Sequence, residues 1–151
     1  MVTKIRDLLA KKGTDVWSIG PGQSVFQAIG MMALKEVGAL TVVDDTGRLV
    51  GIISERDYAR KIILKGRSSR QTSVSEIMTR RVIYVDEDAR LEECMALMTA
   101  KKVRHLPVLR NDDLVGIVSV GDLVKSIIDE QSFVIEQLER YIRGETVGVS
   151  V

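Results

Sequence analysis

Apolar positions in the first half of the chain follow two spacings. Apolar residues three and four positions apart predict helices, and short apolar runs between turn residues predict strands. Ser24 and Gln27 form a capping-box pattern, which predicts the start of one helix. The predicted order is helix, strand, helix, strand, strand and helix, over residues 1–12, 15–19, 24–37, 39–43, 49–53 and 55–64.

The second half repeats this order after a linker, residues 65–73, that contains no apolar residue. A short helical turn comes first, followed by strand, helix, strand, strand and helix, over residues 74–78, 82–85, 88–101, 105–109, 114–118 and 121–128. The halves align with a shift of 66 residues through Val42 and Val108, and of 65 residues from Leu49 and Leu114 onward. The second hairpin turn is therefore one residue shorter.

Two nine-residue stretches show the repeat most clearly. Residues 49–57, LVGIISERD, and residues 114–122, LVGIVSVGD, are identical at six of nine positions. Each leads from a strand pattern through Gly-Ile-x-Ser-x-x-Asp into a helical pattern. Each copy therefore presents a serine and an aspartate at a strand-to-helix junction, which is where we expect a functional site.

The repeats predict an α/β (α+β) fold. A unit of about 60 residues buries only about 60% of its unfolded surface, so the two copies should pack together as one pseudo-twofold module. Each copy is β-α-β-β-α, with helices on one face of a small mixed sheet. The predicted divisions are residues 1–72 for the first repeat with its leading helix and linker, 73–129 for the second, and 130–151 for a C-terminal amphipathic helix and tail.

Composition limits the classes of function. The chain has 151 residues, 45% hydrophobic and 28% charged, which is typical of a globular protein. Its net charge of +1 gives no overall field that would attract nucleic acid or a membrane surface, so phosphate recognition must be local. The single Cys94 cannot form an internal disulfide, and no secretory signal or membrane span is apparent, so we expect a cytoplasmic protein.

Catalysis and metal binding are not expected. The one histidine and one cysteine lie on different predicted elements, and no paired His or Cys motif suits a metal. No phosphate-binding Gly-x-x-x-x-Gly-Lys-Ser loop is present either. The few aromatic residues form no platform for stacking nucleic-acid bases. We therefore predict a protein that is not an enzyme and has no catalytic cofactor.

The repeated junction has two interpretations. Ser54 with Asp57, and Ser119 with Asp122, have the spacing of helix caps, in which serine and acid exchange hydrogen bonds with each other's backbone. The same helix N-terminus offers unpaired N–H groups, and an aspartate there can accept both hydroxyls of a ribose. A cap normally needs neither the duplicated strand nor the preceding glycine, which would let a ligand approach the backbone.

In these features the sequence resembles a tandem pair of cystathionine-β-synthase (CBS) domains, called a Bateman module. The resemblance covers about residues 4 to 130. It is carried by the two junctions, the hairpins GALTVVDDTGRLVGI and RHLPVLRNDDLVGI, and EIMTRRVIYVDEDARLEECMALMTAKKVRHLPV. It implies a disc-like module that binds AMP, ADP, ATP, NAD or S-adenosylmethionine in clefts between the repeats, and that associates into a homodimer.

The resemblance assigns roles to matching residues. Asp57 and Asp122 match ribose-binding aspartates, and Ser54 and Ser119 match hydroxyl residues beside the sugar or phosphate. Ser18 matches a small hydroxyl residue in the first strand that lines the adenine pocket. Its counterpart in the second repeat is Tyr84, which either narrows that pocket or offers a ring for stacking.

Basic residues are distributed unevenly between the repeats. Arg104 and His105 match a phosphate-contacting position of the family, whereas their first-half counterparts, Gly38 and Ala39, carry no charge; Ala39 is retained as a candidate pocket residue. Arg56 lies inside the first junction, where the second has a glycine. We therefore favour the cleft at the first junction. His105 also fits a structural hydrogen-bonding residue, and Arg56 a surface residue.

The resemblance therefore implies a stand-alone regulatory module that senses an adenosine-containing ligand and passes the signal to an unidentified protein. The alternative is a structural or dimerisation protein with an unoccupied cleft, which the amphipathic stretch near the C-terminus would suit. Neither nucleic acid nor a membrane is an expected partner.

Overall fold

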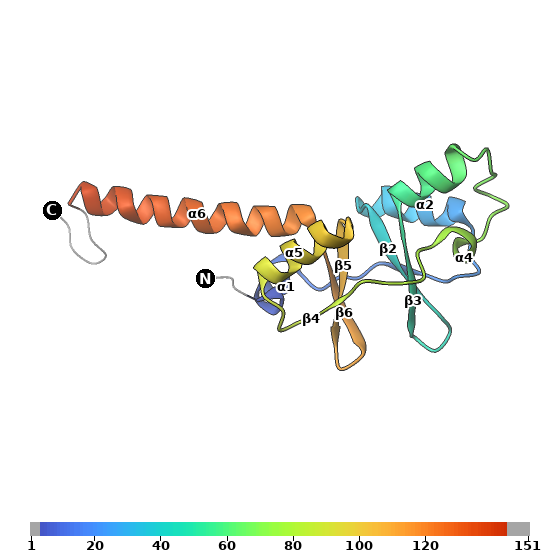
Figure 1. Cartoon of the computed structure of the whole chain (residues 1–151), viewed down its shortest axis with the longest axis horizontal. Helices are drawn as coiled ribbons and strands as arrows, with labels where there is room; N and C mark the ends of the chain where they lie inside the picture. The colour runs from blue at the N-terminus through green and yellow to red at the C-terminus, as the bar shows by residue number, and fades with distance from the viewer. Residues whose placement is uncertain (1–3, 145–151) are drawn as a thin grey trace.

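The structure is a computed structural model that describes residues 4–144; the predicted C-terminal tail lies outside these residues. Its helices alternate with two hairpins, as the hydrophobic pattern predicts (Figure 1). The elements are α1 (Ile5–Lys12), β1 (Ser18–Ile19), α2 (Val25–Lys35), β2 (Ala39–Val43), β3 (Leu49–Ser54), α3 (Glu55–Tyr58), η1 (Ala59–Ile63), α4 (Val74–Ile77), β4 (Val85–Asp86), α5 (Leu91–Lys101), β5 (His105–Arg110), β6 (Asp113–Ser119) and α6 (Val120–Ile142).

The strands form two separate three-stranded sheets of the same topology. In the first, β1 is parallel to β2, and β2 is antiparallel to β3; β4, β5 and β6 repeat this arrangement. The mixed α/β fold of two related repeats is thereby confirmed. Ser24 caps α2, since its hydroxyl accepts the Gln27 N–H at 3.1 Å, as the capping-box pattern predicts.

Several predicted elements differ in extent, and β1, for example, covers only Ser18–Ile19 of the strand expected over residues 15–19. The helix expected over residues 55–64 consists of one α-helical turn followed by a π-helical turn, η1. The strand expected over residues 82–85 shortens to β4, so Tyr84 precedes it. Its partner strand has Pro107 where the first repeat has Thr41, and proline has no backbone N–H to donate to a neighbouring strand.

The C-terminal amphipathic helix is not a separate element. Residues 120–142 form the single helix α6, which includes the last helix of the second repeat. No glycine or proline occurs between Asp122 and Ile142, so nothing in the sequence ends the helix there. The distal part of α6 extends away from both sheets (Figure 1).

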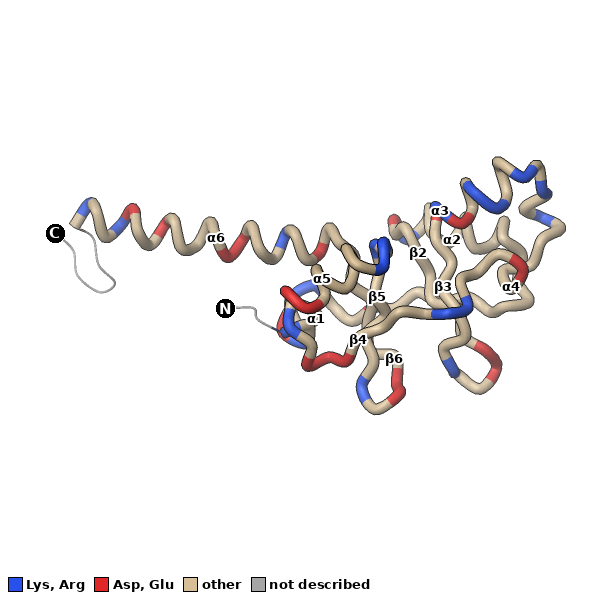
Figure 2. Tube along the Cα trace, viewed as in Figure 1, with Lys and Arg blue, Asp and Glu red and all other residues tan. Residues whose placement is uncertain are grey.

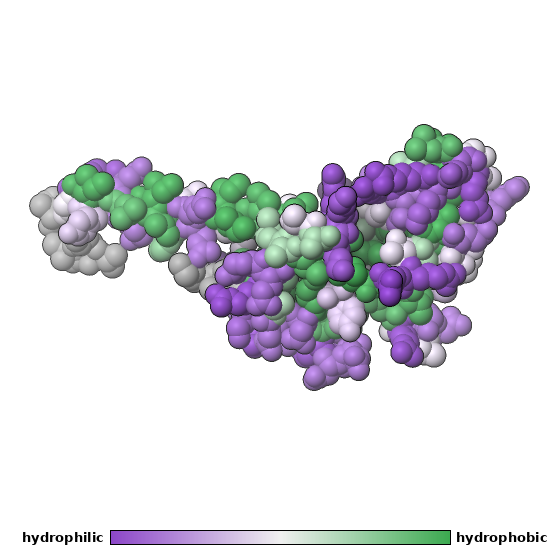
Figure 3. All heavy atoms as spheres, viewed as in Figure 1, coloured by the Kyte–Doolittle hydropathy of each residue, from purple (hydrophilic) through white to green (hydrophobic). Residues whose placement is uncertain are grey.

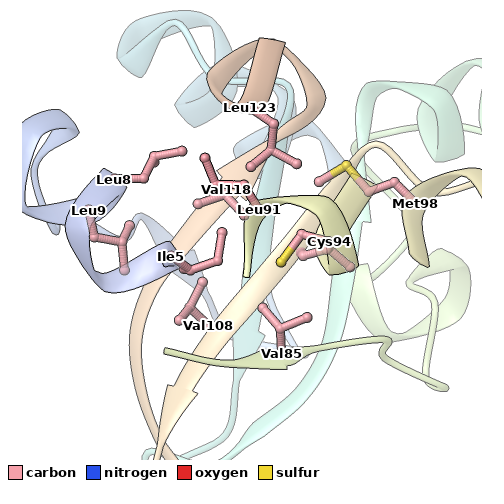
Figure 4. Close-up of a cluster of buried hydrophobic side chains, with 11 residues drawn as sticks. Ile5, Leu8, Leu9, Val85, Leu91, Cys94, Met98, Val108, Val118 and Leu123 are labelled. Atoms are coloured by element: carbon pink, nitrogen blue, oxygen red, sulfur yellow. The ribbon is translucent and has the colours of Figure 1, made fainter. Parts of the chain in front are cut away.

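Each sheet is covered by a helix from the other half of the chain. The leading helix α1 contributes Ile5, Leu8 and Leu9 to the core of the second repeat, which also contains Cys94 and Leu123 (Figure 4). Burial raises the pKa of the Cys94 thiol to about 11. In the other half, α4 contributes Val74 and Ile77 to the core of the first repeat, and Met78, which follows α4 directly, joins them. Packing therefore crosses the boundary that the sequence places at residues 72 and 73.

Backbone hydrogen bonds hold α1 and α4, each of which packs on the repeat in the other half of the chain, in equivalent positions. The N–H groups of Ile5 and Arg6 donate to the carbonyls of Ala89 and Glu87 at 2.9 Å. The Val74 N–H donates to Gln23 at 2.8 Å, and the Ser75 N–H to Pro21 at 2.9 Å. The pseudo-twofold relation therefore includes the helices before the sheets as well as the sheets themselves.

The glycines of the two junctions make room for these helices. A Cβ added to Gly51 would lie 2.5 Å from Met78 Sδ and 3.1 Å from the Thr79 carbonyl oxygen. A Cβ added to Gly116 would lie 2.8 Å from both terminal carbons of Leu9. The glycine face expected to admit a ligand is thus filled at Gly116 by Leu9 of α1, and at Gly51 by Met78 and Thr79, which follow α4.

Gly51→Ala should lower the free energy of unfolding by about 1–3 kcal/mol, because the new methyl group overlaps Met78 and meets backbone at Thr79. Chemical denaturation followed by circular dichroism would measure the loss. Gly22→Ala is the matched control, since no atom lies within 4 Å of its added Cβ. Equal stabilities of the two variants would contradict the packing role of Gly51.

Candidate functional site

Both repeated junctions cap a helix. The Ser54 hydroxyl accepts the Asp57 N–H at 3.2 Å, and Asp57 Oδ2 accepts the Ser54 N–H at 3.0 Å. Ser119 and Asp122 make the same two hydrogen bonds, at 3.1 and 2.8 Å. The capping interpretation is therefore confirmed, and it fixes the orientation of both carboxylates.

A lysine contacts each capping aspartate, but from different parts of the fold. Lys61, one helical turn after Asp57, lies 3.0 Å from its Oδ1 and donates to the Ile77 carbonyl at 2.8 Å. In the second junction Lys12, from α1, lies 2.7 Å from Asp122 Oδ2. Burial opposes ionisation of Asp122, but hydrogen bonds from Lys12 and Ser119 outweigh it and lower its pKa.

A cleft of about 770 Å³ opens between the repeats at the first junction. It is lined by five predicted site residues, Ser54, Arg56, Asp57, Arg104 and His105. Three come from the end of β3 and from α3, and two from the start of β5. The fold thus brings together residues about fifty positions apart, as the interpretation of the first junction requires.

The cleft is strongly basic although the whole chain is nearly neutral. Its cationic lining residues are Arg56, Arg60, Lys61, Arg81, Lys102 and Arg104, against only Glu55 and Asp57 as acids. Among residues 4–144, the cations other than Lys61 form no ion pair with a carboxylate. Figure 2 shows basic residues at the start of β5 and beside α3. Such a concentration of unpaired cations favours an anionic ligand.

Four of the six lining cations were not predicted from the sequence, namely Arg60, Lys61, Arg81 and Lys102. Arg60 follows Arg56 by four positions, a spacing that places both on one helix face, so it could have been found. Lys102 precedes Arg104 by two residues at the helix end. Arg81 has no such signal, because its position depends on the segment after α4, which pairs with β3 through Thr79.

His105 packs between the repeats. A Cβ added to Gly38 would lie 3.4 Å from two ring atoms of His105, so the absence of a side chain there makes space for the imidazole. Burial lowers the pKa of His105; Asp122 opposes this shift, and Lys12 and Arg104 add to it. The ring is therefore mainly neutral near pH 7.

The remaining predicted residues lie outside the lining of this cleft. Ser18 and Thr41 share a hydrogen bond between their hydroxyls at 2.5 Å, across the parallel pair β1 and β2. Ala39 is buried, and Tyr84 is 56% exposed. Ala39 is nevertheless the register partner of Ser54 in the β2–β3 pair, so it lies directly beside the cleft, whereas within residues 4–144 Ser18 and Tyr84 have no such pairing with a lining residue.

The second junction differs in shape. Asp122 lines a groove of about 700 Å³ between α1 and α6, together with Lys12, Lys125 and Phe133. Ser119 is engaged in the cap and is not among the lining residues. The two junctions are thus equivalent in backbone and different in their surroundings.

Comparison with known proteins identifies the repeats. The chain matches the family model for the CBS domain twice, over residues 5–64 and 74–129. It is 38% identical to the CBS domain-containing protein CBSX3, mitochondrial, of Arabidopsis thaliana, over 94% of this chain and 73% of that protein. No helix within residues 4–144 has the length and apolar character needed to cross a membrane.

Solved structures are similar over most of the chain. A CBS-domain protein of proposed signal-transduction role from Burkholderia ambifaria is 47% identical, with a TM-score of 0.80 over 86% of this chain and 96% of that one. The CBS domain pair of protein MJ0100, solved with 5′-methylthioadenosine and S-adenosyl-L-methionine, is 26% identical, with a TM-score of 0.77 over 86% of this chain and 99% of that one.

Acidification below about pH 6.5 should destabilise the protein through His105. Burial depresses its pKa in the folded state, so the unfolded chain binds the proton more readily and stability falls as pH falls through this range. The chain has one histidine, so His105→Gln should remove this component. Urea unfolding at intervals from pH 7.5 to pH 5.5 measures it, and parallel curves for both proteins would contradict it.

Proposed function

This chain belongs to the CBS-domain family, as a tandem pair, and we propose that it is a stand-alone regulatory module that binds an adenosine-containing anion at the first junction. The candidates are AMP, ADP, ATP and NAD, with S-adenosylmethionine as a further member of the class. Binding would be reported to a regulated protein through a change in shape or affinity. The proposal assigns the chain no catalytic role.

One observation carries this proposal, the convergence of unpaired cations beside a capping aspartate. Asp57 Oδ2 serves the Ser54 cap, whereas Asp57 Oδ1, among residues 4–144, has an ion pair with Lys61 alone. A carboxylate so placed can accept hydroxyl groups of a ribose. Arg56 and Arg104, from opposite repeats, supply charge for a phosphate chain. A nucleotide combines these two chemical groups in one molecule.

The position of the cleft suggests how binding is reported. Its cations come from both repeats, so a phosphate chain held by Arg56 and Arg104 would bridge them. A ligand shifts a conformational equilibrium only when it binds one arrangement better than another. A bridging anion meets this condition, because its contacts with both walls depend on their separation.

The other predicted residues would take lesser roles in binding. Ser18, Ala39 and Tyr84 would act at the margin of the site, and Ser119 and Asp122 would form a second, weaker site. We propose a reducing compartment such as the cytoplasm, because the single cysteine is buried and cannot form an internal disulfide. The similar Arabidopsis protein is named as mitochondrial, so the reducing interior of an organelle is the other candidate compartment. We also propose a homodimer, and neither nucleic acid nor a membrane as a partner.

A structural or dimerisation role is the second candidate function. The observation that favours it is the exposed apolar surface of α6, where Leu138 is 57% and Ile135 55% exposed. Such a protein would dimerise without needing a ligand in the cleft. Ligand binding therefore separates the two candidates.

Thermal unfolding in the presence of AMP, ATP, NAD or S-adenosylmethionine tests the sensor function. A ligand at about 100 times its dissociation constant should stabilise the folded state by about 2.7 kcal/mol. The basic cleft predicts larger effects for the anionic nucleotides than for S-adenosylmethionine, which carries a positive sulfonium. Absence of a shift with all four would refute the sensor function and leave the structural role.

Substitutions at the cleft should separate ribose recognition from phosphate recognition. Arg56→Gln and Arg104→Gln should each weaken ATP binding by about 1 kcal/mol, roughly fivefold in the dissociation constant, because both cations are solvent-accessible. Isothermal titration calorimetry measures this change. Lys101→Gln, which removes the same charge outside the lining, is the matched control.

The two capping aspartates provide an internal comparison. Asp57→Asn retains a side-chain oxygen for the cap but loses the charge, and should weaken binding of adenosine nucleotides. Asp122→Asn makes the same change in the second capping box and should have a smaller effect on affinity. The reverse order would transfer the principal site to the second junction.

A further inference from the structure

We infer that the distal part of α6 is the interface for a second copy of this chain, which pairs with it in antiparallel orientation. This inference specifies the homodimer proposed above and does not depend on ligand binding. It rests on the spacing, exposure and charge of residues 124–142.

The apolar residues of α6 recur every seven positions. Ile128, Ile135 and Ile142 form one row, and a second row contains Ile127, Val134 and Tyr141. Between these rows a third contains Val124, Gln131 and Leu138. Eight of these nine positions are apolar, Gln131 being the exception, and together they form the stripe typical of helices that pack against other helices.

This apolar stripe is not covered by any of residues 4–144. Beyond Leu123 no side chain of α6 is buried, and Val134, Tyr141 and Ile142 are 43%, 74% and 81% exposed. Apolar groups recur along the length of α6 (Figure 3). Because α6 is continuous from Val120 to Ile142, its distal half cannot fold back onto the module that carries it. Within residues 4–144 nothing covers it, and a second copy of the chain is the cover that we infer.

The helix is complementary to a reversed copy of itself. If Val124 lies opposite the partner's Tyr141, the same alignment sets Ile127 opposite the partner's Leu138 and Gln131 opposite the partner's Val134. The twofold relation repeats each pair, which gives six layers in total. Gln131 is the one polar residue in these layers, and a single polar core residue commonly fixes the alignment of paired helices.

Charges beside the stripe support the antiparallel orientation. Lys125 lies near the start of the helix and Glu139 near its end, on the same side of the stripe. An antiparallel pair brings this side of both helices together, so Lys125 approaches the partner's Glu139. On the other side Glu130 approaches the partner's Gln137, so no like charges meet. A second copy therefore satisfies both the apolar and the charged positions.

Light scattering coupled to size-exclusion chromatography tests the interface. The unmodified chain should be a dimer, and Leu138→Glu should raise its dissociation constant at least about 100-fold, because each dimer then buries two charges. Phe133→Glu is the matched control, since Phe133 is similarly exposed, at 62%, but lies on the opposite side of α6. A monomeric parent chain, or equal effects of both substitutions, would overturn the inference and leave another protein as the occupant.

Engineered cysteines test the orientation. The double variant Val124→Cys with Tyr141→Cys should form a covalent dimer under mild oxidation, whereas each single variant should not. In the antiparallel pair, identical positions at 124 lie about 25 Å apart, too far for a disulfide. Self-linked single variants would overturn the antiparallel arrangement. ATP should still stabilise the folded state of the Leu138→Glu variant in thermal unfolding, because the cleft is unchanged. The dimer proposal and the ligand proposal can therefore fail separately.

Discussion

The close contact between a helix and a glycine in each sheet is the constraint on which the rest of the structure depends. Met78 fills the space above Gly51, and Leu9 fills the space above Gly116. Residues of a helix from the other half complete the hydrophobic core beneath each three-stranded sheet. The repeats are therefore joined through their cores, and the cleft between them has walls set by that packing.

The two halves keep the same backbone and differ where side chains meet between them. His105 occupies space that exists because Gly38 has no side chain at the related position. Asp57 contacts Lys61, one helical turn further along the chain. Asp122 instead contacts Lys12 of α1, which belongs to the first half of the chain. Positive charge then accumulates on one side, since the first cleft gathers cations from both repeats. The duplicated sequence thus produces two junctions with unequal surroundings.

Local features of the fold could be predicted from the sequence. Strand β2 has the predicted bounds, and the capping boxes at Ser24, Ser54 and Ser119 are present, because turn and cap chemistry depends on neighbouring residues. The packing of α1 could not be predicted, since it depends on contacts about 80 to 110 residues away. The inclusion of Arg81 in the cleft and the exclusion of Ser18 depend on the same long-range geometry.

The continuity of α6 also gives the second junction a mechanical property. The helix begins at the Ser119 cap, and its first turn is fixed by Leu123 in the core of the second repeat. Its nineteen residues beyond Leu123 span about 28 Å, at about 1.5 Å per residue. A tilt of about 5° at this anchored end displaces the far end by roughly 2.5 Å over that length. The helix is therefore a lever, which converts a small rotation of the second repeat into a movement as large as an atomic diameter.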